Sequence, residues 1–345
     1  MSLGLSMIVK NEAKTLPRLA ESLRSQIDFW TIVDTGSTDD TMAVAWEVFE
    51  GIPGQFLHDE WRGFGRCRTY ALRAAQQHTD WVMWIDADET LVGTIDTDLD
   101  GNCIEALQHF GNLRYWLPRL TKGPEWGWEG RAHEYLTHPA AQRVKTKDFY
   151  IVHHADGGSR GDKYHRDLTL LLEDWEEHRE ARTAFYLGRT NQDVGALHEA
   201  IGWYRTRLTM PGWQEETFYT LYSLGLCLLA AGAADEGCGA LWASWGLCDC
   251  RGDPLVALAE HYRSTSQWHL AWHAASLAQE YHDSAYPGLF MDANLEWRIP
   301  YEISIAAWYT GHRDQGQVAQ EWLALHDDIP EAYRTSIEAN LAFYS

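Results

Sequence analysis

Blocks of apolar residues alternate with polar segments along the first part of the chain. Residues 3–9 and 30–33 are short apolar runs closed by charged or turn-forming residues, which is typical of buried strands. Between them, Leu16, Leu19 and Leu23 recur at the spacing of a helix that buries one face. The pattern therefore predicts a strand, a helix and a second strand in succession.

The alternation continues to residue 86. Residues 41–50 and 65–78 have helical spacing, and residues 54–61 and 81–86 read as two further strands. In the segment 65–78, the apolar positions of the expected helix are Tyr70, Leu72, Ala74 and Ala75. Strands that alternate with helices favour an α/β fold with a mainly parallel sheet.

The middle of the chain is less regular. Residues 111–120 and 147–155 predict strands, and residues 123–138 between them are rich in Trp, Gly and charge. Residues 153–167 read as a loop that leads into a helix. We therefore expect the α/β domain to end near residue 166.

Helical patterns dominate from residue 167 to the end. Three loosely similar segments place a small residue after Leu at Gly188, Gly225 and Ala259, which are 37 and 34 residues apart. This spacing is close to the 34-residue period of tetratricopeptide repeats. We expect stacked helix pairs with a concave surface suited to a peptide or another partner.

Length and charge support two domains, an α/β domain at 1–166 and an all-α helical-repeat domain at 167–345. At roughly 100–200 residues per domain, 345 residues suggest two. The net charge of −22 is unevenly spread, with −6 on residues 1–166 and −16 on residues 167–345. Because nucleic-acid affinity needs clustered cations, a broad surface for DNA is disfavoured.

No apolar run reaches the roughly 18 residues that a membrane-spanning helix requires. The apolar run before Lys10 is also too short for a signal sequence. From these features, and from the reduced thiols that its six Cys suggest, we expect a cytoplasmic protein without a membrane span.

Acidic residues follow two of the expected strands. Asp86, Asp88 and Glu89 close an apolar run, and Asp34 precedes Gly36, which permits a sharp turn. In open α/β sheets, ligands bind at the carboxyl ends of the strands, and carboxylates there suit Mg²⁺ or Mn²⁺. Capping of the next element is the alternative interpretation for both groups of acids.

Four segments in this order, MIVKNEAKTL, VDTGSTDDT, GRCRTYAL and WIDADE, resemble family 2 glycosyltransferases of the GT-A fold. EGRAHEYL and HHADGGSRGDKYHRDLTLLL resemble later segments of that family, and the helical half resembles its tetratricopeptide-bearing branch. One departure is Thr69, where the family often has Asn after the Arg. The resemblance covers most of the chain.

The resemblance implies a nucleotide-sugar donor, favoured as a UDP-sugar, and a divalent metal, Mn²⁺ or Mg²⁺. The implied nucleotide contacts are Val9, Lys10, Glu12, Asp34, Gly36, Arg68, Asp86 and Lys163. Within this set, Asp34 would bind a uracil-type ring and Arg68 would reach the ribose or phosphates. The implied metal ligands are Asp86, Asp88 and His154, with His153 as the alternative to His154.

Sugar transfer of the inverting hexosyltransferase type needs a metal for the leaving diphosphate and a base for the acceptor hydroxyl. Glu134 is our candidate base, and Glu89 is its competitor because it adjoins the metal motif. A structural ion pair is the alternative for His133 and Glu134. Arg160, Lys163 and Arg166 either contact diphosphate or form a solvated helix start.

Trp126 and Trp128 are candidates for an acceptor platform together with His133, since an indole face packs well on a sugar; core packing is the alternative. We expect a protein, peptide or glycan acceptor, and a modified base in DNA is less favoured.

A non-catalytic tetratricopeptide-like binding protein is a further alternative. A nucleotidyltransferase would need a Gly-rich basic loop that MIVKNEA lacks.

Overall fold

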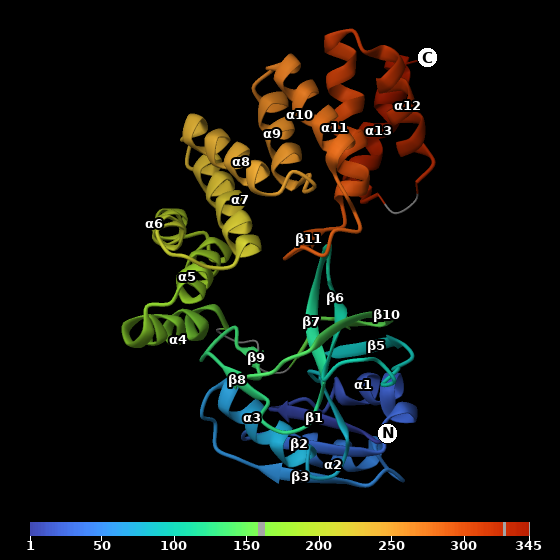
Figure 1. The fold of residues 1–345 in the computed structure, drawn as a ribbon. Helices are drawn as coiled ribbons and strands as arrows, with labels where there is room; N and C mark the ends of the chain where they lie inside the picture. Colours follow the sequence, from blue (N-terminus) through green and yellow to red (C-terminus); the bar gives the residue numbers. More distant parts are fainter. Residues whose placement is uncertain (158–162, 327–328, 345) are drawn as a thin grey trace. The chain divides into compact units, whose positions relative to one another are not determined.

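The computed structural model describes residues 1–157, 163–326 and 329–344 (Figure 1). It divides into two compact units, Met1–His178 and Arg179–Ser345. The boundary predicted after residue 166 falls inside helix α4 (Lys163–His178), which the division assigns to the first unit. Arg131 of that unit pairs with Glu173 of α4 at 2.9 Å.

The first half of unit 1 follows the predicted alternation. Its elements are β1 (Leu3–Val9), α1 (Leu16–Leu23), a short 3₁₀ turn (Arg24–Gln26), β2 (Phe29–Asp34), α2 (Thr41–Val48), β3 (Gly54–His58), α3 (Phe64–Ala75) and β4 (Trp81–Trp84). β1 runs parallel to both β2 and β4, and β2 runs parallel to β3. These parallel pairs bring the carboxyl ends of the strands to one edge of the sheet.

The second half of unit 1 completes the sheet with antiparallel and parallel neighbours. Its strands are β5 (Glu89–Gly93), β6 (Cys103–Phe110), β7 (Leu113–Lys122), β8 (Gly127–Glu129), β9 (Tyr135–Thr137) and β10 (Arg143–His153). The order across the main sheet is β3-β2-β1-β4-β7-β6-β10-β5, and β8 pairs with β9 separately. Of these strands, the sequence predicted only β7 and β10.

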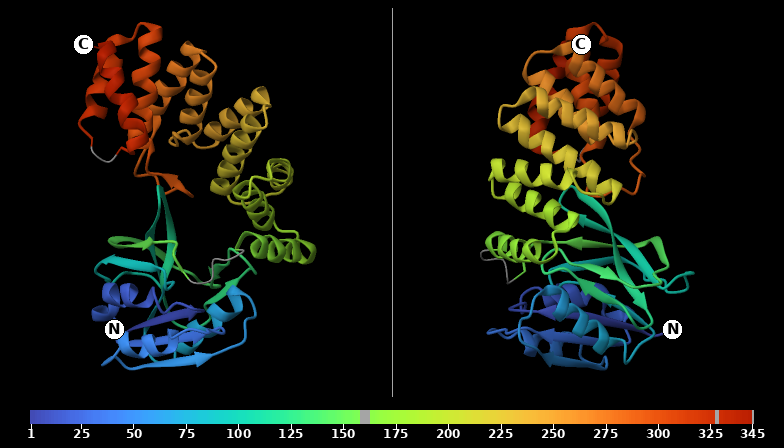
Figure 2. Two further views of the ribbon diagram at one scale, coloured as in Figure 1. Left: turned by 180° about the vertical axis from the view of Figure 1, so that it is seen from behind. Right: turned by 60° about the vertical axis from the view of Figure 1, so that its left-hand side comes forward.

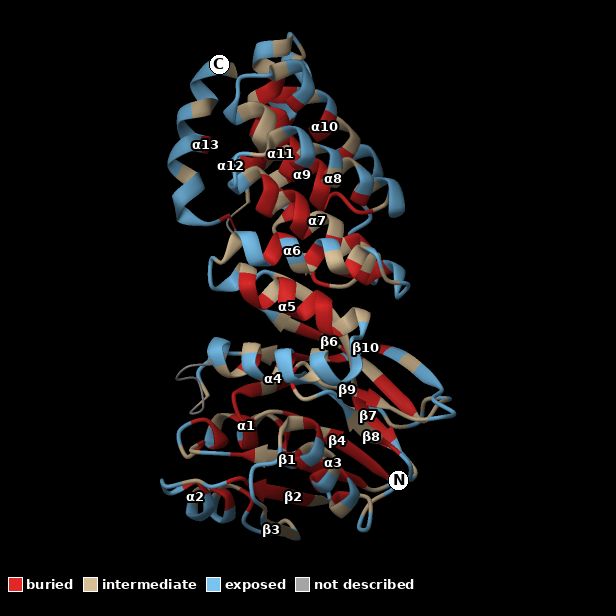
Figure 3. Ribbon diagram, turned by 90° about the vertical axis from the view of Figure 1, so that its left-hand side faces the viewer, coloured by how far each residue is buried: buried red, intermediate tan, exposed pale blue. Residues whose placement is uncertain are grey.

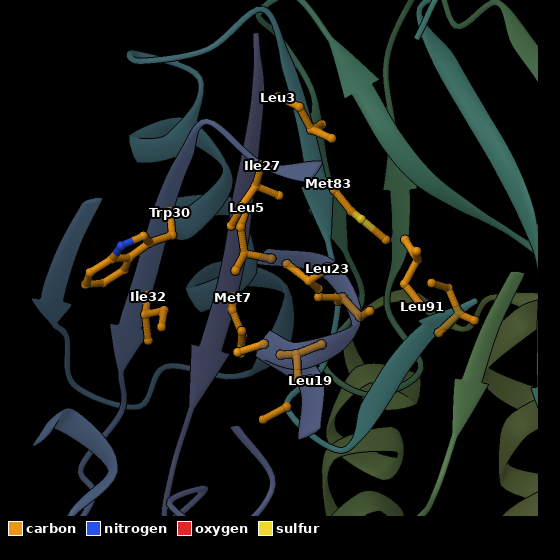
Figure 4. Packing of buried hydrophobic residues seen from close by; sticks show 14 of the residues in the cluster. Leu3, Leu5, Met7, Leu19, Leu23, Ile27, Trp30, Ile32, Met83 and Leu91 are labelled. Atoms are coloured by element: carbon orange, nitrogen blue, oxygen red, sulfur yellow. The ribbon is translucent and has the colours of Figure 1, made fainter. Parts of the chain in front are cut away.

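The core of unit 1 lies between the sheet and its helices. Leu5 and Met7 on β1 gather with Leu19 and Leu23 on α1, as Figure 4 shows. Each of these side chains is at most 1 % exposed. Full burial of a leucine stabilises a fold by roughly 1.5–3 kcal/mol, so the spacing seen in the sequence fixes how α1 covers the sheet.

Helix α3 differs from its prediction in one respect. Leu72 and Ala75 are buried as expected, but Tyr70 is 44 % exposed. The helix instead turns Gly65, Cys67 and Ala71 inward. These three inward residues are small, so neighbouring backbone can come close to this face of the helix.

Unit 2 is built from consecutive helices that pack in antiparallel pairs (Figure 2). The helices are α5 (Ala181–Asp193), α6 (Leu197–Leu208), α7 (Gln214–Ala230), α8 (Ala234–Leu247), α9 (Asp253–Ser264), α10 (Trp268–Tyr281), α11 (Leu295–Thr310), α12 (Arg313–Ala324) and α13 (Glu331–Tyr344). The two-residue strand β11 (Met291–Asp292) precedes α11. Among the residues described, no helix combines the length and apolar character needed to cross a membrane.

The small residues of the sequence repeat lie where paired helices touch. A Cβ atom on Gly188 of α5 would come within 2.6 Å of the Tyr204 ring on α6, and one on Gly225 of α7 within 2.7 Å of Leu241 on α8. Ala259 of α9 is fully buried. Figure 3 shows the buried residues gathered along α5, α7 and α9. The repeat therefore marks helix contacts.

Candidate active site

The carboxyl ends of β1, β2 and β3 lie side by side, because Val9 pairs with Asp34 and Asp34 pairs with His58. The Asp34 carboxylate accepts hydrogen bonds from the backbone N–H groups of Gly36 at 3.3 Å and Ser37 at 3.1 Å. Gly36 has a φ of +110°, a backbone conformation that residues with a side chain rarely adopt. The turn therefore holds Asp34 at the edge of the sheet.

Beside Asp34 there is an open pocket of about 480 Å³. This volume lies within the range of roughly 300–1,000 Å³ that is typical of small-molecule sites. The Trp61 indole is 39 % exposed and packs edge-on against Phe64 with ring centroids 4.7 Å apart. His58 Nδ1 lies 3.4 Å from Asp34 Oδ2. The pocket is lined by Asp34, Thr35, Gly36, His58, Asp59, Glu60 and Trp61.

The predicted contacts at the end of β1 are divided. The Val9 side chain is 3 % exposed and lies in the core, so only the backbone of Val9 could contribute to the predicted lining of a nucleotide base. Lys10 is exposed, whereas Glu12 is buried. Glu12 Oε2 accepts a hydrogen bond of 2.6 Å from Thr15 Oγ1. The backbone N–H of Glu12 donates to Thr41 Oγ1 at 2.8 Å. Glu12 therefore braces the turn after β1.

A tight turn joins β4 to β5 and carries the three acids of the WIDADE segment. The N–H of Asp86 donates to Glu89 Oε2 at 3.0 Å, and the N–H of Glu89 donates to the carbonyl of Asp86 at 3.0 Å. Asp88 is held from the other side, because its Oδ2 accepts the N–H of Gly157 at 3.2 Å. Hydrogen bonds from within the turn and from Gly157 thus define its shape.

Asp88 and Glu12 offer oxygen ligands from two different segments. Asp88 Oδ2 and Glu12 Oε1 each lie 3.1 Å from the position that a Cβ atom would take on Gly157. All-oxygen donors of this kind fit a hard cation such as Mg²⁺ or Mn²⁺. Within the described ranges, no group of three or more His, Cys, Asp or Glu side chains is already arranged to hold a metal ion.

The two adjacent histidines differ in their contacts. His154 Nε2 lies 2.8 Å from Thr90 Oγ1, so its ring is turned to that hydroxyl. His153 Nδ1 lies 3.7 Å from Asp88 Oδ1 and 3.6 Å from Glu89 Oε1. The ring nearer to the Asp88 carboxylate is therefore that of His153, and the His154 backbone N–H reaches the Asp88 carbonyl at 3.0 Å.

Glu89 forms a closed ion pair with Arg119 of β7. Two bonds of 2.9 Å join the guanidinium to both carboxylate oxygens, and Arg119 also donates to Gln108. The Arg119 and Glu89 side chains are 0 % and 5 % exposed. Burial acts to raise the pKa of Glu89, but the Arg119 charge and the hydrogen bonds outweigh it and lower the pKa to about 2. A carboxylate of so low a proton affinity is a poor general base.

Arg68 of α3 joins Asp86 to Glu134. Its Nε donates to Glu134 Oε1 at 2.7 Å, and its Nη2 lies 2.7 Å from Asp86 Oδ1. The guanidinium lies 5.1 Å from the ring centroid of Trp84 and 5.5 Å from that of Trp128. Burial opposes the charge, but the two carboxylates raise the pKa of Arg68 above its usual value.

These contacts show which groups Arg68 meets within the protein. The side chain is 10 % exposed, and its Nη2 and Nε are engaged by Asp86 and Glu134. Asp86 keeps an exposed side, with 30 % of its side chain accessible. Burial raises the pKa of the Asp86 carboxyl, and the Arg68 guanidinium opposes that rise.

The two tryptophans of the expected acceptor platform have different environments. Trp126 is fully buried among Leu72, Val82 and their neighbours, and its Nε1 donates to the Lys122 carbonyl at 3.1 Å. Its prediction as an acceptor contact is therefore wrong, because a buried indole offers no face to a sugar. Trp128 is half-buried, and its ring meets Trp84 edge-on at 4.7 Å.

The remaining predicted residues lie near the end of the domain. His133 adopts a φ of +52° immediately before Glu134. Lys163 begins α4, but its side chain and the whole of Arg160 lie outside the described residues. The Arg166 guanidinium lies 5.5 Å from the centroid of the Phe64 ring, and its Nε is 3.7 Å from Asp167.

Sequence reasoning missed four residues of this region, namely His58, Trp61, Trp84 and Arg119. His58 ends β3 and Trp61 follows it, so the rule that ligands bind at carboxyl ends of strands would have included them. Arg119 stands inside an apolar stretch, where an arginine is rarely buried without a partner. Its guanidinium lies 4.0 Å from the centroid of the Trp84 ring, which Arg68 also contacts.

Comparison with known proteins follows the same division of the chain. Residues 5–162 match the family model described as Glycosyl transferase family 2. A lipopolysaccharide core biosynthesis glycosyltransferase, LpsC of Rhizobium meliloti, is 36 % identical over 92 residues, which are 26 % of this chain and 33 % of that protein. An uncharacterized glycosyltransferase of Rickettsia felis is 31 % identical over 94 residues, 27 % of this chain and 31 % of that protein.

A TPR repeat-containing protein of Synechococcus elongatus is 39 % identical over 97 residues, 28 % of this chain and 23 % of that protein. The chain thus spans about a quarter to a third of the length of these relatives. Among solved structures, MamA is similar with 18 % identity and a TM-score of 0.38, over 52 % of this chain and 92 % of that one. YrrB, a TPR protein, is 14 % identical with a TM-score of 0.40, and the match covers 50 % of this chain and 81 % of that one. TM-scores this low support no argument about partners.

Proposed function

We propose that the protein is a glycosyltransferase that moves a sugar from a nucleotide diphosphate sugar to an acceptor hydroxyl, because residues 5–162 match the model of glycosyl transferase family 2. The observation that carries the proposal is the meeting of Asp86 and Glu134 on one buried guanidinium, beside Asp88. A donor-site acid and a candidate base thus lie at the same edge of the sheet.

The pocket beside Asp34 is proposed to take the nucleobase. The carboxylate keeps acceptor capacity beyond the turn N–H groups that it already accepts, and a uracil-type ring offers an imide N–H to it. His58 adds a ring nitrogen next to that carboxylate, and the exposed indole of Trp61 offers a stacking face. A UDP-sugar is therefore the favoured donor.

The diphosphate and its metal are proposed to lie at the turn between β4 and β5. Asp88 and the exposed side of Asp86 would hold Mn²⁺ or Mg²⁺, with His153 or His154 as a further ligand. When bound, such a cation supplies charge neutralisation for the leaving diphosphate. The N–H of Gly157 holds the Asp88 carboxylate, and the Arg68 guanidinium holds that of Asp86.

Glu134 is proposed as the base. Its carboxylate oxygen takes the proton of the acceptor hydroxyl while that hydroxyl's oxygen bonds to the anomeric carbon of the sugar. The bond from the anomeric carbon to the diphosphate breaks at the same time, and the diphosphate leaves with the electron pair. A single displacement of this kind inverts the anomeric centre. Glu89 is not favoured, because Arg119 occupies both of its oxygens.

The acceptor is proposed to be a glycan. The printed name of the Rhizobium meliloti relative assigns that protein to lipopolysaccharide core biosynthesis, which is a reason to favour a saccharide hydroxyl here. Trp128 and His133, which precede Glu134 in the chain, are the proposed acceptor contacts. A peptide or protein acceptor is the second choice, and DNA is disfavoured by the net charge of −22.

The proposal is tested by calorimetric titration of UDP and of GDP in the presence and absence of Mn²⁺, with release of UDP from a panel of UDP-sugars as the second measurement. We expect UDP to bind with Mn²⁺, and Asp88→Ala to weaken that binding at least about tenfold. Asp98→Ala, an exposed acid of the same unit, is the matched control and should bind as the wild type does.

Absence of binding for every nucleotide diphosphate, with no UDP released, would refute the proposed activity. Full Mn²⁺-dependent binding by Asp88→Ala would refute only the metal assignment. A set of oligosaccharide acceptors, compared with peptides and with duplex DNA, then identifies the acceptor class from the increase in UDP release over water alone.

A further inference from the structure

Helix α3 presents three residues of one face to the segment that carries Glu134. Gly65, Arg68 and Thr69 are three and four positions apart, so they lie along the same side of the helix. Facing them is the segment from Gly127 to Glu134, which consists of β8 and the turn that leads to β9. Each of the three residues makes a different kind of contact with it.

Gly65 allows the two backbones to touch. A Cβ atom at this position would lie 2.8 Å from the carbonyl oxygen of Gly130 and 3.3 Å from that of Trp128. The first distance is shorter than any normal contact of a Cβ atom, and its partner is backbone that cannot rotate away. Any larger residue would therefore push the segment off the helix.

Thr69 fixes the segment by a hydrogen bond. Its Oγ1 accepts the backbone N–H of Trp128 at 2.9 Å, in a part-buried position. A single side chain thus determines which residue of β8 lies opposite this turn of the helix. This is the position at which the sequence departs from the Asn that the related family often has.

Arg68 holds the far end of the same segment through the 2.7 Å bond from its Nε to Glu134 Oε1. Its guanidinium reaches Asp86 as well, so the helix connects the candidate base to the turn between β4 and β5. Between these anchors, Gly130 and Glu134 are themselves close, because a Cβ on Gly130 would lie 3.4 Å from the Cα of Glu134.

We infer that this face of α3, made of Gly65, Arg68 and Thr69, sets the position of Glu134, and that Thr69 is a positioning residue for the transfer reaction. The catalytic meaning rests on the proposed function, but the positioning itself does not. The competing account is that the apolar contacts of Leu136 with the core hold the segment alone, in which case the hydroxyl of Thr69 is dispensable.

The test compares Thr69→Val, which removes the hydroxyl at nearly constant volume, with Thr69→Ser, which restores it. Arg73→Ala, an exposed position of the same helix, is the matched control. Amide hydrogen exchange of the peptide spanning residues 127–137 reports the positioning without any substrate. UDP binding, and kcat and KM for UDP release from UDP-glucose with Mn²⁺, report its consequence.

A part-buried hydrogen bond corresponds to about a tenfold effect. We therefore expect Thr69→Val to speed exchange in 127–137 about tenfold and to lower kcat about tenfold or more, with UDP binding and KM within about twofold. Thr69→Ser should return both values to within about twofold of the wild type. Gly65→Ala should act in the same direction as Thr69→Val.

Unchanged exchange and unchanged kcat in both Thr69→Val and Gly65→Ala would overturn the inference. Loss of UDP binding together with kcat in both variants would also overturn it, because the face would then support the whole domain. Faster exchange in Thr69→Val while the wild type releases no UDP would leave the positioning supported and refute the proposed function.

Discussion

Both units bury arginines against carboxylates, but the carboxylates of these pairs differ in how far they are exposed. In unit 2, Arg207 bonds Glu216 at 2.6 Å and the two side chains are 0 % and 6 % exposed. In unit 1, Arg68 is 10 % exposed while its partner Asp86 is 30 % exposed. The first pair can only hold helices together, whereas the second retains a carboxylate face that a ligand can reach.

The same contrast exists inside unit 1. Arg119 and Glu89 are as buried as Arg207 and Glu216, although Glu89 is next to Asp88 in the chain. A buried ion pair is therefore not a mark of function by itself, since structural networks also perturb pKa values. Exposure of one partner at the carboxyl end of a strand distinguishes the candidate site from its support.

Glu134→Gln tests the group of residues around Arg68 in unit 1 and has the largest expected effect. Replacing the base by an amide of the same shape should lower UDP release about 10²- to 10⁴-fold, because the acceptor proton has no acceptor. Binding of UDP, measured by calorimetry, should stay within about threefold of the wild type. Glu125→Gln, an exposed acid close by in the sequence, is the control, and equal rates in both variants would disprove the assignment.

Arg207→Met tests the buried ion pair of unit 2. It leaves the Glu216 carboxylate buried without its cation, and removal of one partner of a buried pair costs about 3–5 kcal/mol. Urea unfolding of the full chain should show this loss in the transition of unit 2, with UDP binding unchanged. The double variant Arg207→Met and Glu216→Leu should recover most of it. A loss below about 1 kcal/mol would show that the pair is not structural.

Acidification tests whether Glu89 and Arg119 form a buried ion pair like that of Arg207 and Glu216. Its pKa of about 2 in the folded protein lies below the ordinary value of 4.5, so its contribution is complete above about pH 4.5 and is lost as pH falls toward 2. The contribution is at most roughly 3 kcal/mol. The difference in unfolding free energy between wild type and Glu89→Gln should shrink over that window. A constant difference from pH 6 to 3 would contradict the pairing.

Arg205→Ala has the smallest expected effect and calibrates the comparison. Arg205 bonds Glu236 at 2.7 Å, but the side chains are 55 % and 65 % exposed. Solvent and salt screen such a pair, so its loss should change the free energy of unfolding by about 0–1 kcal/mol. A loss as large as that of Arg207→Met, in the same urea titration, would mean that burial does not separate the two classes.

The sequence alone determined the elements whose apolar pattern is strong. The bounds of β1 coincide with the apolar run 3–9, and the leucines of α1 are buried as their spacing requires. It also determined that Asp34 and Asp86 stand at strand ends, because the order of strands and helices places them there. The strands β8 and β9 were missed because three residues are too few to display a period.

The tertiary structure decided which of the candidate side chains are available. Glu89 and Glu134 look alike in the sequence, and only the arrival of Arg119 from β7 and Arg68 from α3 gives them different environments. Trp126 and Trp128 are two residues apart, yet one is in the core and the other beside Arg68. Burial and charge pairing depend on residues far away in the chain, so local pattern cannot determine them, whereas hydrophobic periodicity is local and can be read directly.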